Sequence, residues 1–248
     1  MAFLRSVVFF IVFILSTIFL SLIMVVATII RNNKLICRIT SDWTKLTIFF
    51  LKYICKIDYK VEGIENLPDS SENYLVVSKH QSTWETYFLY YFFENRASFV
   101  LKKELLSVPV IGYGLKKTGH IAIDRKAGGS AMKKLIKDAE RLINKEHRKI
   151  VIFPQGTRTP INGTTKDYPY KSGFLGIVRD LKLDIVPIAL NTGCFWPKRS
   201  FIKKPGTIII KILPIIKYCD LVDKKKEEII SCIENTIEGE TNKLVRNN

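Results

Sequence analysis

The sequence predicts an α/β fold in which a largely parallel central sheet is flanked by helices and preceded by an N-terminal membrane-anchoring helical segment. Short apolar runs alternate with helical stretches along most of the 248 residues, which is the pattern of a largely parallel α/β domain. The chain opens with a long uncharged run, which predicts the anchor. We expect a membrane anchor over residues 1–57 and a domain over residues 58–248, long enough for one sizeable core.

The first anchor element is expected over residues 6–30, a run of 25 residues without charge, proline or glycine. At about 1.5 Å per residue, such a helix is roughly 37 Å long and can cross a bilayer. A cleaved secretory signal has a shorter apolar core and a small-x-small cleavage site, so we predict a retained anchor. More basic residues follow the run than precede it, which predicts that the rest of the chain is cytoplasmic. They are Arg31, Lys34 and Arg38, against Arg5 alone.

The second anchor element is expected over residues 34–57, where a helical wheel separates basic from apolar side chains. The basic side is formed by Lys34, Arg38, Lys45, Lys52 and Lys56. The apolar side is formed by Ile36, Ile39, Trp43, Leu46, Phe50, Ile54 and Ile57. Ile48 and Leu51 interrupt the polar side, so we predict an amphipathic helix in the headgroup region, with its lysines towards anionic membrane lipid. The alternative is a helix packed on the domain.

The remaining elements follow from apolar runs and helical periods. Strands are expected over residues 59–61, 74–78, 98–101, 121–123, 150–153, 185–190 and 207–212. Helices are expected over residues 84–93, 110–117, 129–144, 173–181 and 224–244. The run over residues 6–30 either crosses the bilayer or bends back within one leaflet beside residues 34–57, and the sequence leaves both arrangements open.

Charge and cysteine content limit the partners. A formal net charge of +16 suits nucleic acid, an anionic membrane or an acidic partner, and it also arises from composition alone. Nucleic acid is disfavoured because the chain is anchored and no motif interleaves base-stacking aromatic residues with basic ones. The five cysteines are odd in number and form no C-x-x-C pair, which favours free thiols in a reducing compartment over zinc or a redox couple. We expect no metal.

The first motif, KHQSTWE at residues 79–85, begins where a predicted strand ends. In open α/β sheets, the carboxyl ends of the strands form the ligand crevice. A neutral imidazole at His80 can take the proton of a substrate hydroxyl, while the Glu85 carboxylate sets the tautomer and stabilises the imidazolium. A His five residues before an acid is also common by chance, so the pair carries weight only together with a second motif.

The second motif, FPQGTR at residues 153–158, follows another predicted strand. Gly156 permits close backbone approach, Thr157 offers a hydroxyl, and Arg158 offers a planar fork that suits phosphate oxygens. Further positive charge is expected from neighbouring strand ends, at Arg125 and Lys103. The two motifs together predict a base beside a phosphate site, whereas solvated surface loops are the alternative for each one alone.

Residues 59 to about 213 resemble the glycerolipid acyltransferase family in four blocks that occur in the family's order. The blocks are His80 with Glu85; Lys103-Glu104-Leu105 with Pro109, Gly112, Gly119 and Ile123-Asp124-Arg125; residues 153–158; and Val186-Pro187-Ile188. The resemblance implies transfer of a fatty acyl group from a thioester, on acyl carrier protein or coenzyme A, to the 2-hydroxyl of a lysophosphatidic acid, which gives phosphatidic acid. We expect no further cofactor, and the basic residues after the anchor predict that the acyltransferase domain lies on the cytoplasmic side of the inner membrane.

The same resemblance implies roles for individual residues. His80 is the general base and Glu85 its orienting partner. The acceptor phosphate is bound by Arg125 and Arg158, and the substrate-binding residues also include Gly156, Thr157, Gln155 and Lys103. Two positions depart from the family's pattern, because the family usually has Asp where this chain has Glu85 and Glu where it has Gln155. The amide of Gln155 can still form a hydrogen bond with a glycerol hydroxyl.

Other functions stay open. Within the enzyme class, the acceptor is alternatively glycerol 3-phosphate or a lyso-amino-acid lipid. From another class, the chain is alternatively a noncatalytic membrane lipid-binding protein on the same fold. A thioesterase or lipase is disfavoured because no serine lies in a G-x-S-x-G turn, and Cys194 has no neighbouring histidine to activate it.

Overall fold

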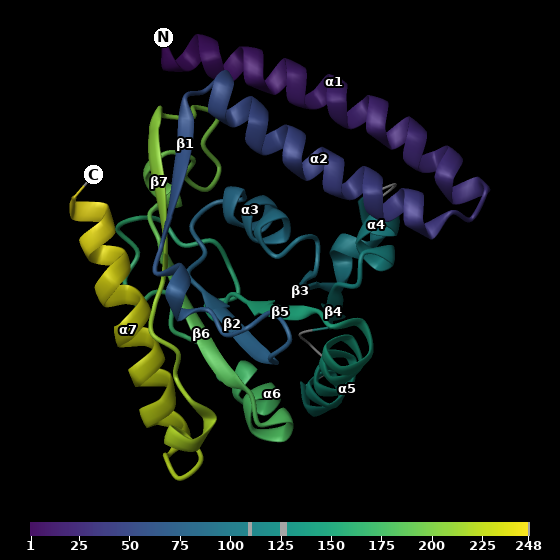
Figure 1. The fold of residues 1–248 in the computed structure, drawn as a ribbon. Coiled ribbons are helices and arrows are strands. Elements are labelled where there is room, and N and C mark those ends of the chain that lie inside the picture. Colours follow the sequence, from purple (N-terminus) through teal and green to yellow (C-terminus); the bar gives the residue numbers. More distant parts are fainter. Residues whose placement is uncertain (109–110, 125–127, 248) are drawn as a thin grey trace.

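The computed structural model describes residues 1–108, 111–124 and 128–247, and these form a seven-stranded sheet with helices on both faces (Figure 1). The strand order is β1-β7-β6-β2-β5-β3-β4. The strands are β1 (Ile57–Glu62), β2 (Tyr74–Ser78), β3 (Ala97–Lys102), β4 (Ile121–Ile123), β5 (Lys149–Ile152), β6 (Asp184–Leu190) and β7 (Gly206–Ile212). Each predicted strand is present, with its ends moved by two residues at most.

Every pairing in this sheet is parallel except that of β6 with β7. The carboxyl ends of β6, β2, β5, β3 and β4 therefore lie along one edge. This confirms the predicted α/β class with a largely parallel sheet. The antiparallel pairing of β6 with β7 allows β1 and β7 to extend the sheet on the side away from β4.

The sheet separates two cores because successive side chains of a strand point to opposite faces. In β2, Leu75 and Val77 enter one core while Val76 enters the other. The first core is covered by α5 (Gly128–Glu146), α6 (Phe174–Leu181) and α7 (Lys226–Arg246). The second is covered by α1 (Ala2–Ile29), α2 (Asn33–Tyr53) and α3 (Trp84–Phe92). Burial on both faces explains why β2 is apolar almost throughout.

Shorter helices complete the chain. α4 covers Ile111–Lys117, and the predicted start of this helix at Val110 lies outside the described residues. Short 3₁₀ helices cover Ile64–Asn66, Lys103–Ser107, Thr192–Cys194 and Tyr218–Asp220.

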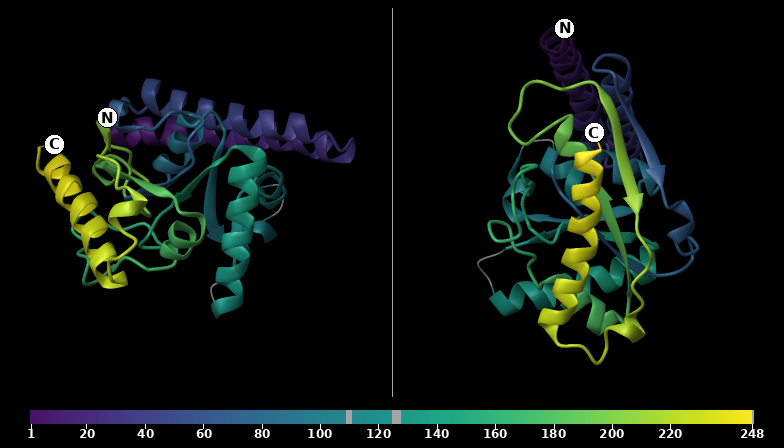
Figure 2. Two further views of the ribbon diagram at one scale, coloured as in Figure 1. Left: turned by 60° about the horizontal axis from the view of Figure 1, so that its bottom comes forward. Right: turned by 90° about the vertical axis from the view of Figure 1, so that its left-hand side faces the viewer.

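The α1 helix lies along the domain beside α2, and the two helices form a hairpin (Figures 1 and 2). Near its start, the Ser6 hydroxyl accepts a 2.8 Å hydrogen bond from the Lys203 backbone N–H. Near its middle, the Thr17 hydroxyl accepts a 3.0 Å bond from the Trp43 indole. Its outer face leaves apolar side chains uncovered, including Phe10, Leu15, Phe19 and Leu22. Among the described helices, α1 alone has the length and apolar composition to cross a membrane.

The second anchor element differs from its predicted form, since α2 ends at Tyr53 and not at residue 57. Lys56 adopts a left-handed conformation with φ of 58°, and Ile57 opens β1 by pairing with Gly206. Strand pairing with a distant segment thus ends the helix before its apolar period does. Ile48 and Leu51, which interrupt the polar side of the wheel, are buried, because α2 packs on the domain through the face that carries them.

Candidate active site

Two sequence motifs meet at the carboxyl edge of the sheet because β2 and β5 are neighbours. His80 follows β2, and residues 154–158 follow β5. The His80 carbonyl accepts hydrogen bonds from the Thr159 backbone N–H at 2.8 Å and from the Thr159 hydroxyl at 3.1 Å. These bonds join the loop after β5 directly to the histidine segment.

Glu85 is held at the start of α3 by donors on the preceding turn. Its side chain is 0% exposed. One oxygen, Oε1, accepts from the backbone N–H groups of Gln81 at 2.6 Å and Ser82 at 2.7 Å. The same oxygen lies 2.8 Å from His80 Nδ1. Backbone donors and the imidazole together replace the water that burial removes from the carboxylate, which fixes the carboxylate behind the ring.

The His80 ring is oriented by two contacts. Because a carboxylate can only accept, the hydrogen bond to Glu85 places the proton of a neutral imidazole on Nδ1 and leaves the lone pair on Nε2. The ring also stacks on Phe153, with centroids 4.0 Å apart and planes 13° from parallel. Its side chain remains 15% exposed, which leaves the ring partly open to solvent. This arrangement suits a histidine that takes a proton from an approaching hydroxyl.

Cationic side chains lie along the loop after β5. Arg158 Nη1 donates a 2.6 Å hydrogen bond to the Thr83 hydroxyl, which lies within the histidine segment. Lys198 Nζ donates a 3.2 Å bond to the Thr157 hydroxyl. Gly156 has φ of 69°, a left-handed conformation that favours glycine, so its turn directs the next residues towards His80. A base and two positive charges therefore occupy the same edge of the sheet.

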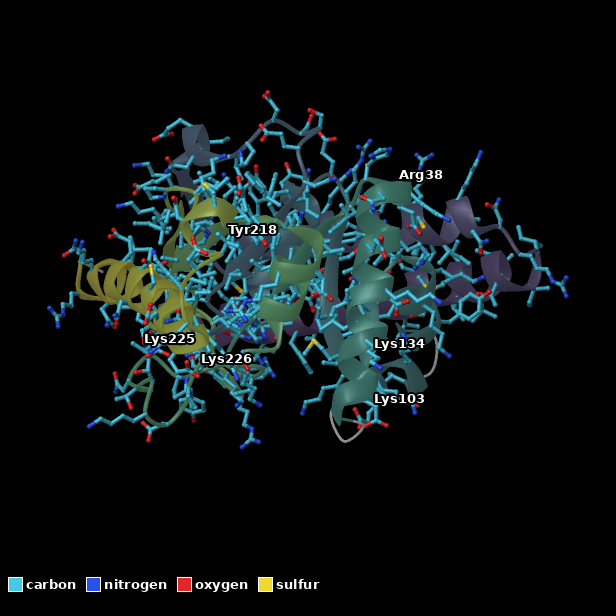
Figure 3. All side chains as sticks on the ribbon, turned by 90° about the horizontal axis from the view of Figure 1, so that it is seen from below. Arg38, Lys103, Lys134, Tyr218, Lys225 and Lys226 are labelled. Atoms are coloured by element: carbon cyan, nitrogen blue, oxygen red, sulfur yellow. The ribbon has the colours of Figure 1, made fainter. Side chains whose placement is uncertain are left out.

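Three further residues were predicted to bind substrate, namely Lys103, Gln155 and Arg125. Lys103 is 66% exposed, its Nζ lies 3.7 Å from Asp124 Oδ2, and it sits near the N-terminal end of α5 (Figure 3). Gln155 is 3% exposed and donates to the Tyr168 carbonyl at 3.3 Å and to Glu238 Oε1 at 3.5 Å, so its side chain points into the interior. Arg125 and Pro109 lie outside the described residues. The roles given to these residues stay predictions.

Two residues of this region were missed by sequence reasoning. Lys198 follows β6, whose carboxyl end lies at the same edge, and the Lys198-Arg199 pair after that strand was the available signal. Thr83 lies inside the first motif, but its contact with Arg158 depends on the pairing of β2 with β5. Thr83 therefore gives no signal of its own in the linear sequence.

Two other kinds of chemistry, a cysteine nucleophile and a bound metal ion, are less well supported by the described residues near this site. Cys194 is partly buried, and burial raises the pKa of its thiol, which disfavours the nucleophilic thiolate. Within residues 1–108, 111–124 and 128–247, no group of three His, Cys, Asp or Glu side chains is arranged to hold a metal ion. The expectation of a metal-free site stays a prediction.

The fold and this site define a class of protein, an α/β protein with a histidine–carboxylate pair and a cationic loop at the carboxyl edge of its sheet. The family described as Acyltransferase matches residues 58–191, and the chain belongs to this family. The match contains both motifs and most of the sheet.

Individual relatives agree with this family. The chain is 39% identical over 176 residues to the 1-acyl-sn-glycerol-3-phosphate acyltransferase of Pseudomonas aeruginosa, which covers 71% of this chain and 66% of that protein. It is 30% identical over 171 residues to 1-acyl-sn-glycerol-3-phosphate acyltransferase alpha of Homo sapiens, which covers 68% of this chain and 59% of that protein. The alignments thus cover less than two thirds of the length of each of these relatives.

A solved structure shows the same fold over the whole chain. The crystal structure of the 1-acyl-sn-glycerophosphate (LPA) acyltransferase PlsC from Thermotoga maritima superposes with a TM-score of 0.74 and 20% sequence identity. The superposition covers 98% of this chain and 98% of that chain, so the helices α1 and α2 belong to the shared architecture.

Proposed function

We propose that this protein is a 1-acylglycerol-3-phosphate O-acyltransferase, which moves a fatty acyl group from a thioester to the 2-hydroxyl of a lysophosphatidic acid and forms phosphatidic acid. The observation that carries the proposal is the 2.8 Å contact between His80 Nδ1 and the buried Glu85 carboxylate, on a segment bonded to the loop of Arg158. The names of the relatives from Pseudomonas aeruginosa and Homo sapiens support the same reaction.

In the proposed reaction, His80 acts as a general base without a covalent enzyme intermediate. Nε2 takes the proton of the acceptor hydroxyl while that oxygen attacks the thioester carbonyl carbon. Glu85 stabilises the resulting imidazolium through Nδ1. The new C–O bond forms, the C–S bond breaks, and the imidazolium returns its proton to the departing sulfur, which leaves as a thiol. The base is thereby restored for the next turnover.

The phosphate of the acceptor is proposed to lie against Arg158 and Lys198. Both cations bond to hydroxyls of the loops that flank His80, so an anion beside them would hold the acceptor close to the base. The interior position of Gln155 also bears on acceptor identity. The family usually has Glu at this position. The amide of Gln155 therefore alters a buried contact with Glu238 but leaves the cations of the loop in place, which favours a phosphate-bearing acceptor.

The donor is acyl carrier protein or coenzyme A, each carrying the acyl thioester. Both are anionic and suit the formal net charge of +16, and initial rates with each donor in turn measure the preference.

Arg158 provides the test of the acceptor. Arg158→Ala is expected to raise the KM for lysophosphatidate by about 30-fold, because a charge-assisted contact with the phosphate is worth about 2 kcal/mol. The KM for the thioester donor should stay within twofold of the wild-type value. Initial rates with purified, detergent-solubilised protein measure both constants.

An acceptor panel completes this test. Wild-type protein should acylate lysophosphatidate in preference to glycerol 3-phosphate and to a lyso-amino-acid lipid that lacks phosphate. Preference for the phosphate-free lipid, or an unchanged KM in Arg158→Ala, would move the acceptor site elsewhere. No transfer from either donor to any acceptor would favour a noncatalytic lipid-binding protein.

We also propose that α1 and α2 lie in the cytoplasmic leaflet of the inner membrane, with the domain facing the cytoplasm. The support is that α1 contacts the domain near both ends, through Ser6 and through Met24 and Ala27, while its outer face stays apolar and uncovered. A helix held along the domain in this way can bury its free face in lipid without crossing. Arg38 and Lys45 on exposed positions of α2 then suit anionic headgroups.

Cysteine labelling tests this arrangement. In a variant without the native cysteines, Ala2→Cys should resist a membrane-impermeant maleimide added outside intact cells and should react after the inner membrane is permeabilised. A matched cysteine in the domain at Lys226 should behave in the same way. Labelling of Ala2→Cys from outside intact cells would show instead that α1 crosses the bilayer.

A further inference from the structure

A buried polar cluster lies on the α7 side of the sheet, behind the candidate active site. Its members are Lys79, Gln155, Tyr170 and Glu238, hereafter the Glu238 cluster. Lys79 is 2% exposed, Gln155 3% and Tyr170 5%. Glu238 comes from α7, and its side chain is 13% exposed. Charged groups buried to this extent are rarely retained without a specific arrangement of partners.

The Glu238 carboxylate is the centre of this cluster. Its two oxygens accept hydrogen bonds from Lys79 Nζ at 2.7 and 2.8 Å. Oε1 also accepts from the Tyr170 hydroxyl at 3.0 Å and lies 3.5 Å from the Gln155 amide nitrogen. Burial lowers the pKa of Lys79, whereas the neighbouring Glu238 opposes that shift, so the ion pair depends on this carboxylate.

Each partner of Glu238 belongs to a segment of the candidate active site. Lys79 directly precedes His80, and its backbone N–H donates to the Ile188 carbonyl of β6 at 3.0 Å. Gln155 lies in the loop that carries Arg158. Tyr170 precedes Lys171, whose backbone N–H donates to the Pro154 carbonyl at 2.9 Å. One side chain of α7 therefore contacts the segment of the base and the loop of the phosphate-binding cation.

The charges of the cluster explain why residue 155 is neutral. One lysine and one carboxylate balance, and Glu234 adds a second acid nearby, 3.4 Å from the Tyr170 backbone N–H. A glutamate at position 155 would bring another carboxylate to about the position of an amide that now lies 3.5 Å from Glu238 Oε1. Two buried like charges at that distance repel each other strongly. An amide can instead donate to Glu238, which the neutral Gln155 does.

We propose that Glu238 is a positioning residue that holds His80 and Arg158 in register, and that Gln155 is neutral because Glu238 already supplies the carboxylate that bonds to both loops. This inference rests on the proposed acyl transfer. Glu238 acts through Lys79 and Gln155 and contacts no reacting atom.

A charge exchange tests the proposal. Four proteins are compared: wild type, Glu238→Gln, Gln155→Glu and the double variant that carries both changes. Glu238→Gln removes one negative charge from the cluster, and Gln155→Glu adds one. Either change should misplace the base relative to the acceptor, so kcat should fall about tenfold or more. The double variant keeps one carboxylate and one amide and should recover to within about threefold of the wild-type kcat.

The KM for the thioester donor separates positioning from general damage, because it should stay within twofold in all four proteins. Glu240→Gln is the matched control, since Glu240 lies on the same helix and pairs with Lys211 and Lys243 but touches neither loop. This control should keep the wild-type kcat. Rates are measured well below the melting temperature and are normalised to folded protein.

The outcomes are distinct. A Glu238→Gln protein that melts at a lower temperature but keeps the wild-type kcat would leave Glu238 a purely structural role and overturn the proposal. A double variant whose loss equals the product of the two single losses would overturn the charge exchange. If wild-type protein transfers no acyl group, the proposed function fails, and the positioning role fails with it. In that case the melting temperatures still test the charge arrangement, because the melting temperature of the double variant should recover towards the wild-type value.

Discussion

His80→Ala is expected to lower kcat for acyl transfer by about a thousandfold, because a positioned general base contributes roughly 10²–10⁴ in rate. Without the imidazole, the acceptor hydroxyl must lose its proton to water while it attacks the thioester. The KM for lysophosphatidate should change little, since Arg158 and Lys198 bond to hydroxyls of Thr83 and Thr157 and not to the ring. Single-turnover rates with a radiolabelled acyl thioester measure the loss.

The fold should survive this change. Thr159 bonds to the His80 carbonyl, which alanine retains, and the lost side-chain contacts are the Glu85 bond and the stacking on Phe153. His147→Asn is the matched control, because His147 is exposed beyond the end of α5 and has φ of 49°, a conformation that asparagine tolerates. A His80→Ala protein that remains folded and turns over at a near-normal rate would exclude the base.

The strands of the sheet were predictable because their signals are local. β2 is buried at all five positions and is followed by polar residues, so its bounds of Tyr74–Ser78 match the predicted 74–78. The rule that ligand sites form at the carboxyl ends of parallel strands then placed His80 near residues 153–158. The pairing of β2 with β5 and the Thr159 bonds to the His80 carbonyl confirm that these two segments meet.

Long-range contacts account for what the sequence did not predict. The end of α2 depends on the pairing of Ile57 with Gly206, and a helical wheel contains no information about that partner. The contact between Gln155 and Glu238 likewise joins a loop to the last helix. Nothing in the linear sequence indicates that Gln155 is also a neutral member of a buried ion-pair cluster.

The contact between His80 and Glu85 was predictable only in part. The spacing is local, but a carboxylate five residues after a histidine can point anywhere. It is the start of α3 at Trp84 that turns Glu85 back towards residues 80–82, where two backbone N–H groups and the imidazole meet one oxygen. The side chain is longer than the aspartate usual in the family by one methylene, and this turn accommodates the extra length.

Glu85→Gln gives the second large expected effect, a loss of about a hundredfold in kcat with a smaller loss of stability than removal of the side chain causes. An amide oxygen can replace Oε1 as acceptor for the Gln81 and Ser82 backbone N–H groups, so the turn keeps its bonds. The negative charge is lost, however, and the imidazolium that forms in the transition state is no longer stabilised. The amide nitrogen would occupy the place of Oε2, which has no hydrogen-bond partner among the described residues, so its buried N–H groups lower the stability of this variant.

Glu85→Ala separates catalysis from folding at the same position. Alanine leaves two buried N–H groups without an acceptor, which costs about 3 kcal/mol of unfolding free energy in addition to the loss of rate. Denaturant unfolding should therefore rank the proteins as wild type, Glu85→Gln and Glu85→Ala, whereas kcat should fall sharply in both variants. If the glutamine protein instead keeps a rate within threefold of wild type, the carboxylate serves only to hold the turn, because in that protein the bonds to Gln81 and Ser82 persist while the charge behind His80 is gone.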